Sequence, residues 1–192
     1  MIGNDVIDLK LAGERNPLRP RFLNKVFTGN EQEIIAKDQN PVKQAWLLWA
    51  MKESAYKAHQ RRFGLRRNFN PLIQECSIFS QTQTSVSGEV LLGNSTYKIT
   101  AKLNTRYIHS TAAALPENLK SRWEIIPASE DLKKKLLATL CGYYGCDIKC
   151  LGIEKDKNSV PVITLNNQHV PLAFSLSHHG EFAAFSFELM NY

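Results

Sequence analysis

The sequence lacks the features that mark several specialised classes of protein. No apolar run approaches the roughly 18 residues of a membrane-spanning helix, and the opening MIGNDVIDLK shows no basic segment followed by a long apolar stretch. The four cysteines, at positions 76, 141, 146 and 150, form no CxxC pair. This pattern favours free thiols in a reducing compartment over a disulfide framework or a zinc site. We therefore expect a cytoplasmic protein with neither a signal peptide nor a membrane partner.

The composition is that of an ordinary globular chain with an excess of positive charge. Hydrophobic residues make up 43% and charged residues 22% of the 192 positions, which fits one large domain or two small ones. The formal net charge is +6. A basic protein attracts nucleic acids, membrane surfaces, phosphorylated ligands or acidic proteins, and the charge alone does not choose among them.

The first part of the chain reads as a strand, helices and then several strands. Residues Ile2–Leu9 predict a short strand. Thr28 and Glu31 fit a capping box that opens a short helix. Pro41 suits the first turn of a longer helix that runs to about Arg61 and ends near Gly64. Alternating and β-branched residues then predict strands at 73–79, 86–92, 97–103 and 107–115.

The second part repeats this order after a connector at 116–128. A helix is expected from Ser129 to about Tyr144, closed by Gly145, and strands are expected at 147–154, 160–165, 171–176 and 182–189. We predict an α+β fold of two similar halves, 1–115 and 129–192, packed as a pseudo-dimer. Each half would place a long helix against a small, mostly antiparallel sheet, and a cleft between them would be a natural ligand site.

One segment places an ionised pair at the end of an apolar stripe. On a helix, Trp46, Trp49, Glu53 and Lys57 fall along one side, running from core tryptophans into a carboxylate and an amine. Such a stripe places the two charges at the edge of the core, near a cleft. A solvated i,i+4 Glu–Lys pair on an ordinary helix surface is the alternative.

Two further segments carry polar groups at the ends of strands. Asp5 and Asp8 lie in the first apolar strand, where a buried carboxylate needs a metal ion or a lysine as partner; a solvated strand end is the alternative. Ser177 and His178 end a later strand and enter a turn, which suits contacts to phosphate or ribose. No GxSxG elbow surrounds the serines, so a serine hydrolase is disfavoured.

Taken together, these segments resemble the 4′-phosphopantetheinyl transferase superfamily. The resemblance rests on Gly3-Asn4-Asp5, on Trp49-Ala50-Met51-Lys52-Glu53-Ser54-Ala55-Tyr56-Lys57 and on Ser177-His178. The length matches the two-half, surfactin-synthetase-activating type. The order of the motifs matches the holo-acyl-carrier-protein synthases, so the halves look permuted or independently fused.

The resemblance implies a reaction and a role for each matching residue. A magnesium-dependent enzyme would move phosphopantetheine from coenzyme A to a serine of an acyl or peptidyl carrier protein and release 3′,5′-ADP. Asp5 and Glu53 would bind Mg²⁺, and Glu53 would also help to deprotonate the serine. Lys57 would neutralise charge on the phosphates. The nucleotide end of coenzyme A would be held by Ser177, His178, Lys52, Arg61 and Arg62.

The sequence also departs from the family pattern. Ile7 occupies the place of a second acidic residue, and Asp8 is either a further metal ligand or a strand-end carboxylate. The expected phosphate-binding lysine is missing near Asn158–Pro161, with Lys155 or Lys157 as substitutes. A non-catalytic module that binds coenzyme A or a carrier protein is therefore the alternative function. The basic run from Lys57 to Arg67 is either a solvated helix end or a surface for the 3′-phosphate or an acidic carrier. No nucleic-acid recognition motif accompanies it. Two fused halves lead us to expect a monomer.

Overall fold

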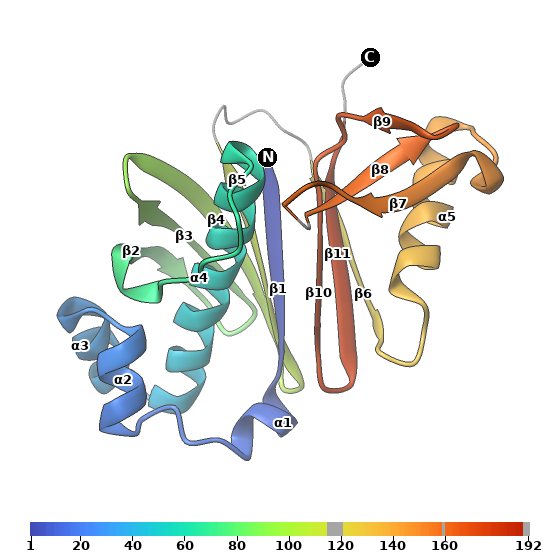
Figure 1. Cartoon of the computed structure of the whole chain (residues 1–192). Coiled ribbons are helices and arrows are strands. Elements are labelled where there is room, and N and C mark those ends of the chain that lie inside the picture. Colours follow the sequence, from blue (N-terminus) through green and yellow to red (C-terminus); the bar gives the residue numbers. More distant parts are fainter. Residues whose placement is uncertain (115–120, 159, 190–192) are drawn as a thin grey trace.

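The computed structural model describes residues 1–114, 121–158 and 160–189, and it places two α+β halves side by side (Figure 1). The elements of the first half are β1 (Ile2–Asp8), α1 (Leu9–Gly13), α2 (Pro20–Val26), α3 (Gly29–Lys37), α4 (Pro41–Phe63), the 3₁₀ turn η1 (Pro71–Ile73), β2 (Gln74–Gln81), β3 (Ser85–Leu92), β4 (Ser95–Leu103) and β5 (Tyr107–Ala114).

The long helix α4 is bounded by the residues that the sequence suggests. The side chain of Asn40 accepts the N–H of Lys43, Pro41 occupies the first turn, and Gly64 closes the helix with a left-handed φ of 59°. The capping box of Thr28 and Glu31 is also present at the start of α3. Because these local signals are strong, the boundaries of both helices follow from the sequence.

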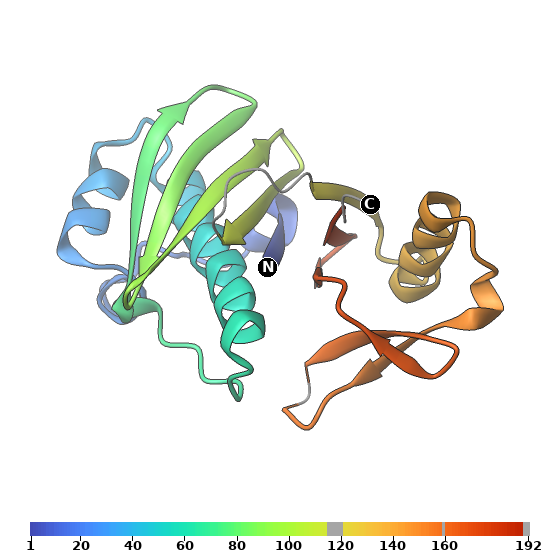
Figure 2. The ribbon, with the colours of Figure 1, turned by 90° about the horizontal axis from the view of Figure 1, so that it is seen from above.

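An antiparallel sheet of order β1-β5-β4-β3-β2 forms the platform of the first half, and α4 covers one of its faces (Figure 2). Alternate residues of the inner strands, such as Val90, Tyr97 and Ile99, are buried against the helix. The edge strand β1 packs closely on α4. A Cβ at Gly3 would lie only 2.0 Å from the carbonyl oxygen of Ser54.

The second half contains β6 (Ser121–Pro127), α5 (Leu132–Tyr144), the 3₁₀ turn η2 (Ile148–Cys150), β7 (Leu151–Lys155), β8 (Pro161–Leu165), β9 (Gln168–Val170), β10 (Phe174–His179) and β11 (Phe182–Glu188). Its first strand β6 pairs antiparallel with β11, just as β1 pairs with β5 in the first half. The predicted α+β class of both halves is confirmed.

Two details of the second half differ from the prediction. The connector expected at 116–128 includes strand β6, because residues 121–127 complete the sheet β10-β11-β6. Residues 115–120 lie outside the described part of the chain. The remaining strands form a separate sheet, β7-β8-β9, in place of a single sheet against the helix.

The halves meet where β1 lies beside β10 (Figure 1). The two strands belong to different sheets, and side chains join them in place of a backbone ladder. Asn4 contacts Ser175 and Ser177, and Asp8 contacts His179, so the strands run in the same direction. No helix in the described residues is long and apolar enough to cross a membrane.

Candidate active site

A cleft of about 530 Å³ opens along this junction, and both halves line it. From the first half it is lined by Asp5, Val6, Ile7, Trp49, Glu53, Tyr56, Lys57, Gln60, Arg61 and Arg67. From the second half it is lined by Lys155, Asn158, Val160, Pro161 and residues 175–179 of β10. Carboxylates, cations and the Ser-His segment, which are far apart in the sequence, therefore face one space.

Lys57 anchors the acidic side of the cleft. Its Nζ donates to Oδ1 of Asp5 at 2.8 Å and to the carbonyl oxygen of Asn4 at 2.9 Å. Asp5 is largely buried and Lys57 only partly exposed, so this ion pair is shielded from water. The interaction fixes the Asp5 carboxylate of β1 against α4, one helical turn from Glu53.

Glu53 lies close enough to Asp5 for their charges to interact. Burial raises the pKa of Glu53 most, and the charge of Asp5 raises it further. Lys57 and Arg67 lower this pKa in part, and the net pKa lies above the ordinary value for glutamate. Two neighbouring carboxylates whose negative charges repel form a site that a cation would stabilise.

The chemistry of this pair fits Mg²⁺. The described residues contain no group of three or more His, Cys, Asp or Glu side chains arranged as a metal cage. Magnesium does not need one, because it commonly uses one or two carboxylates together with waters and substrate phosphates. Asp5 and Glu53 supply two carboxylates in a cleft that is open to such a substrate.

Several cations also line the cleft. Arg61 stacks its guanidinium over Phe174 at 4.8 Å and donates to the carbonyl oxygen of Pro161 at 2.9 Å. Burial lowers the pKa of Arg61 to about 10, with Asp156 opposing the shift, so the side chain stays charged near neutral pH. Arg67 and Lys155 line the same space. These cations suit an anionic ligand with several phosphates.

Strand β10 brings the Ser-His segment to the cleft. Ser177 is nearly buried, and its Oγ accepts from Nδ2 of Asn4 at 3.1 Å, which leaves its own hydroxyl hydrogen to donate. His178 is exposed and faces the opening. The Nδ1 of His179 accepts the backbone N–H of Asp8 at 2.9 Å, so its proton resides on Nε2.

Comparison with known families agrees with this geometry. A model of the 4′-phosphopantetheinyl transferase superfamily matches residues 1–115. The chain belongs to this superfamily. Compared with curated proteins, the sequence shows no significant match. The members act on coenzyme A and carrier proteins, and the chain is a transferase of the phosphopantetheinyl kind.

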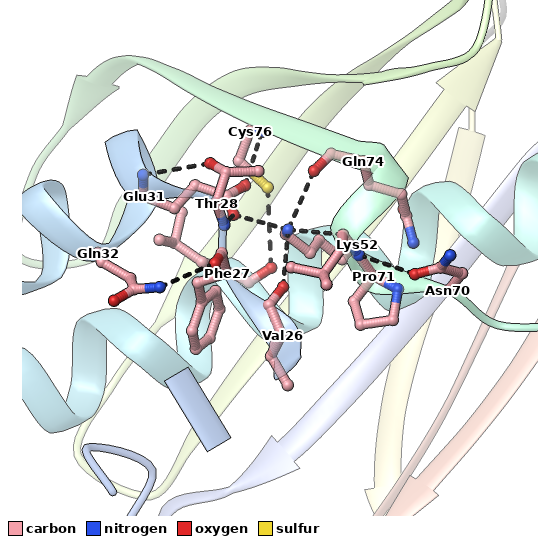
Figure 3. A network of polar contacts seen from close by, with 12 residues as sticks. Val26, Phe27, Thr28, Glu31, Gln32, Lys52, Asn70, Pro71, Gln74 and Cys76 are labelled. Atoms are coloured by element: carbon pink, nitrogen blue, oxygen red, sulfur yellow. Dashed lines mark hydrogen bonds and ion pairs between the residues drawn. The ribbon is translucent and has the colours of Figure 1, made fainter. Parts of the chain in front are cut away.

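Lys52, predicted to bind coenzyme A, lies instead in the core, within a network of polar contacts (Figure 3), and is absent from the described lining of the phosphopantetheinyl transferase cleft. Its side chain is 0% exposed, and Nζ forms an ion pair with Glu31 at 2.6 Å. Nζ also donates to the carbonyl oxygens of Val26, Pro71 and Gln74 at 2.8–3.0 Å. The structure therefore contradicts a contact between Lys52 and the substrate.

Two other predicted side chains also point elsewhere. Asp8 caps helix α1 with Oδ1, and its Oδ2 accepts the backbone N–H of Glu181 at 2.8 Å. Burial acts to raise the pKa of Asp8, but the backbone donors outweigh it and the net pKa is lowered. Asp8 is thus a strand-end carboxylate satisfied by N–H groups. Arg62 packs over the ring of Phe63 and does not line the cleft within the described residues.

The structure adds cleft residues that the sequence analysis did not assign to the site. His179 and Ser175 lie on the same face of β10 as Ser177, a relation that strand alternation could have indicated. Tyr56 accepts the N–H of Asn68 at 2.6 Å and holds the segment that carries Arg67. No local sequence signal distinguishes Tyr56 or Gln60 from ordinary helix residues.

Proposed function

We propose that the protein transfers the 4′-phosphopantetheine group from coenzyme A to a serine of an apo carrier protein and releases 3′,5′-ADP, with Mg²⁺ held by Asp5 and Glu53. The observation that carries the proposal is the cleft itself, in which the carboxylates of Asp5 and Glu53, several cations and the Ser-His segment line one space at the junction of the halves. A pyrophosphate with a bound divalent cation matches this lining, because the phosphates suit the cations of the cleft and the divalent cation suits its carboxylates.

Each group has a defined task in the proposed reaction. The serine oxygen of the carrier attacks the phosphorus that bears pantetheine, and the bond from that phosphorus to the bridging oxygen of ADP breaks. Glu53 accepts the serine proton, because its carboxylate lines the cleft beside Asp5, where the serine and the phosphates meet. Lys57 holds Asp5 in place and adds positive charge beside the transferred group.

The remaining residues bind and orient coenzyme A. Arg61, Arg67 and Lys155 attract its phosphates, and Lys155 takes the place of the family lysine that is missing from the sequence. Ser177 and His178 contact the nucleotide end. When bound, Mg²⁺ would neutralise negative charge on the pyrophosphate.

The proposal also covers the carrier protein, the cellular compartment and the oligomeric state. The excess of positive charge favours an acidic carrier protein over a neutral one. All four cysteines are free thiols, which is consistent with a reducing, cytoplasmic setting. Because both sides of the cleft come from one chain, we propose that a monomer is active.

Intact-mass analysis of an apo carrier protein incubated with coenzyme A, Mg²⁺ and this protein tests the proposal. We expect a gain of one phosphopantetheine unit that a chelator abolishes. Glu53→Gln should slow transfer by about 10²- to 10⁴-fold, the usual contribution of a general base. Glu33→Gln is the matched control, because Glu33 is exposed on α3 and pairs only with Lys37 within the described residues.

The opposite results would separate the two functions considered. Full activity of the Glu53→Gln variant would refute the assigned role of Glu53. Binding of coenzyme A without transfer to acyl or peptidyl carriers would favour the non-catalytic binding module.

A further inference from the structure

The junction between β1 and β10 is held by side chains at regular intervals. Ser175, Ser177 and His179 alternate along β10, so they share the face that is directed at β1. Ser175 Oγ accepts the backbone N–H of Asn4 at 3.0 Å, and His179 Nδ1 accepts that of Asp8 at 2.9 Å. Side-chain acceptors thus satisfy N–H groups on the edge of β1 that has no ladder partner.

Asn4 lies at the centre of this junction and joins three elements. It is 0% exposed. Its Nδ2 lies 3.1 Å from Ser177 Oγ on β10 and 3.3 Å from His109 Nε2 on β5. Its carbonyl oxygen accepts from Lys57 on α4. A buried amide with contacts to three elements holds them in one relative position.

His109 is suited to receive the second amide hydrogen of Asn4. Burial, followed by the nearby charge of Lys57, lowers the pKa of His109 to about 3, so the imidazole is neutral. A neutral imidazole whose Nε2 carries no proton is an acceptor. The two hydrogens of the Asn4 amide can therefore be shared between Ser177 and His109.

The neighbours of Asn4 belong to the two sides of the cleft. Asp5 follows it directly on β1, and Ser177, its partner on β10, directly precedes His178. We propose that Asn4 is a positioning residue that fixes the carboxylates of the first half against the Ser-His segment of the second half. This inference rests on the proposed function, because it concerns the binding of coenzyme A between the carboxylates of the first half and the Ser-His segment of the second half.

Removal of the Asn4 amide should affect substrate binding more than the chemical step. Asp5, Glu53 and Lys57 keep their own contacts, since Lys57 uses the backbone oxygen of Asn4. Ser177 loses its link to β1, while the links through Ser175 and His179 remain. A displacement of about 1 Å in the Ser-His segment can cost up to 10²-fold. We expect Asn4→Ser to raise the KM for coenzyme A by about tenfold, within that range, and to change kcat less than about threefold.

A double-mutant cycle with Ser177 tests whether the two residues act through one contact. Ser177→Ala removes the acceptor of Asn4, so the double variant should have a KM close to that of the worse single variant. Ser186→Ala is the matched control: Ser186 is equally buried, lies on the neighbouring strand β11, and has no hydroxyl partner among the described residues. It should leave KM and kcat unchanged.

Hydrogen exchange of peptides covering residues 174–179 gives a readout that needs no activity. Asn4→Ser should accelerate exchange there, whereas Ser186→Ala should not. An unchanged KM in a folded Asn4→Ser variant, or additive effects in the cycle, would overturn the inference. If the wild type proves unable to transfer phosphopantetheine, the proposed function fails, and the hydrogen exchange of residues 174–179 then tests the inference by itself. Unchanged exchange in Asn4→Ser overturns the link between Asn4 and β10, and faster exchange supports it.

Discussion

Replacing Lys52 with methionine removes one buried cation and leaves the shape of the side chain nearly intact. In the wild type, Nζ is surrounded by the carboxylate of Glu31 and by three carbonyl oxygens, with no exposure to water (Figure 3). The carboxylate also accepts the N–H groups of Thr28 and Cys76. The network joins α4 to the start of α3 and to the segment that leads into β2.

The size of the effect follows from the charge that remains. Without Lys52, Glu31 keeps a buried negative charge that two backbone N–H groups only partly compensate. Breaking a buried pair in this way costs about 3–5 kcal/mol of unfolding free energy. For a chain of this length, that corresponds to a fall in Tm of roughly 6–20 °C.

Adding Glu31→Gln to Lys52→Met should recover part of the loss. The amide oxygen of glutamine can still accept an N–H, and no buried charge remains. Recovery should be incomplete, because the carbonyl groups of Val26, Pro71 and Gln74 lose the donor that Nζ provided.

Urea denaturation of the single and double variants measures these differences. Lys37→Met is the control, because Lys37 forms an exposed pair worth less than about 1 kcal/mol. The KM of folded Lys52→Met for coenzyme A should equal that of the wild type. A loss of stability below about 1 kcal/mol, or a raised KM at full folding, would refute the structural role assigned to Lys52.

Two other perturbations test the packing and the electrostatics of the junction. Gly3→Ala should strongly destabilise the chain, because the new Cβ would meet backbone atoms of Ser54 and Ala58 at 2.0 and 2.6 Å. A thermal melt measures this effect. A Tm within about 2 °C of the wild type would contradict the close contact of β1 with α4. The pKa of His109 is about 3 in the folded chain and near 6.5 in the unfolded chain. Between pH 3 and pH 6.5 the unfolded state therefore binds more protons than the folded state. The free energy of unfolding should thus fall with decreasing pH by up to about 1.4 kcal/mol per pH unit. Urea titrations at pH 4–7 should show a shallower slope for His109→Gln than for the wild type, and equal slopes would contradict this assignment.

The sequence predicts local elements well where their boundaries depend on nearby residues. The capping box at Thr28, the proline at position 41 and the left-handed Gly64 define helix ends through contacts within a few residues. The sequence places the β6 segment in the connector, because its strand character depends on pairing with β11, more than fifty residues away in the sequence. Long-range pairing of this kind leaves little local signal.

The contrast between local signals and long-range contacts also explains which site residues the sequence places correctly. Periodicity places Asp5, Glu53 and Lys57 on faces that could meet a cleft, the family resemblance gives them their expected roles, and all three line the cleft. Lys52 is adjacent to Glu53, yet it points to the opposite side of α4, into a pocket of carbonyl groups formed by segments distant in sequence. A fully buried lysine is unusual, so the local sequence gives no sign that Lys52 lies in the core.

The short connection between the halves has a consequence for how the site depends on protein concentration. Strand β5 ends at Ala114 and β6 begins at Ser121, so residues 115–120 join the half that carries the carboxylates to the half that carries the Ser-His segment. A short tether keeps its two ends at an effective concentration in the millimolar range. Separate subunits that shared such a cleft would dissociate on dilution and lose it. Here the cleft forms within one molecule, so the fraction of complete sites is the same in a cell that holds few copies as in one that holds many.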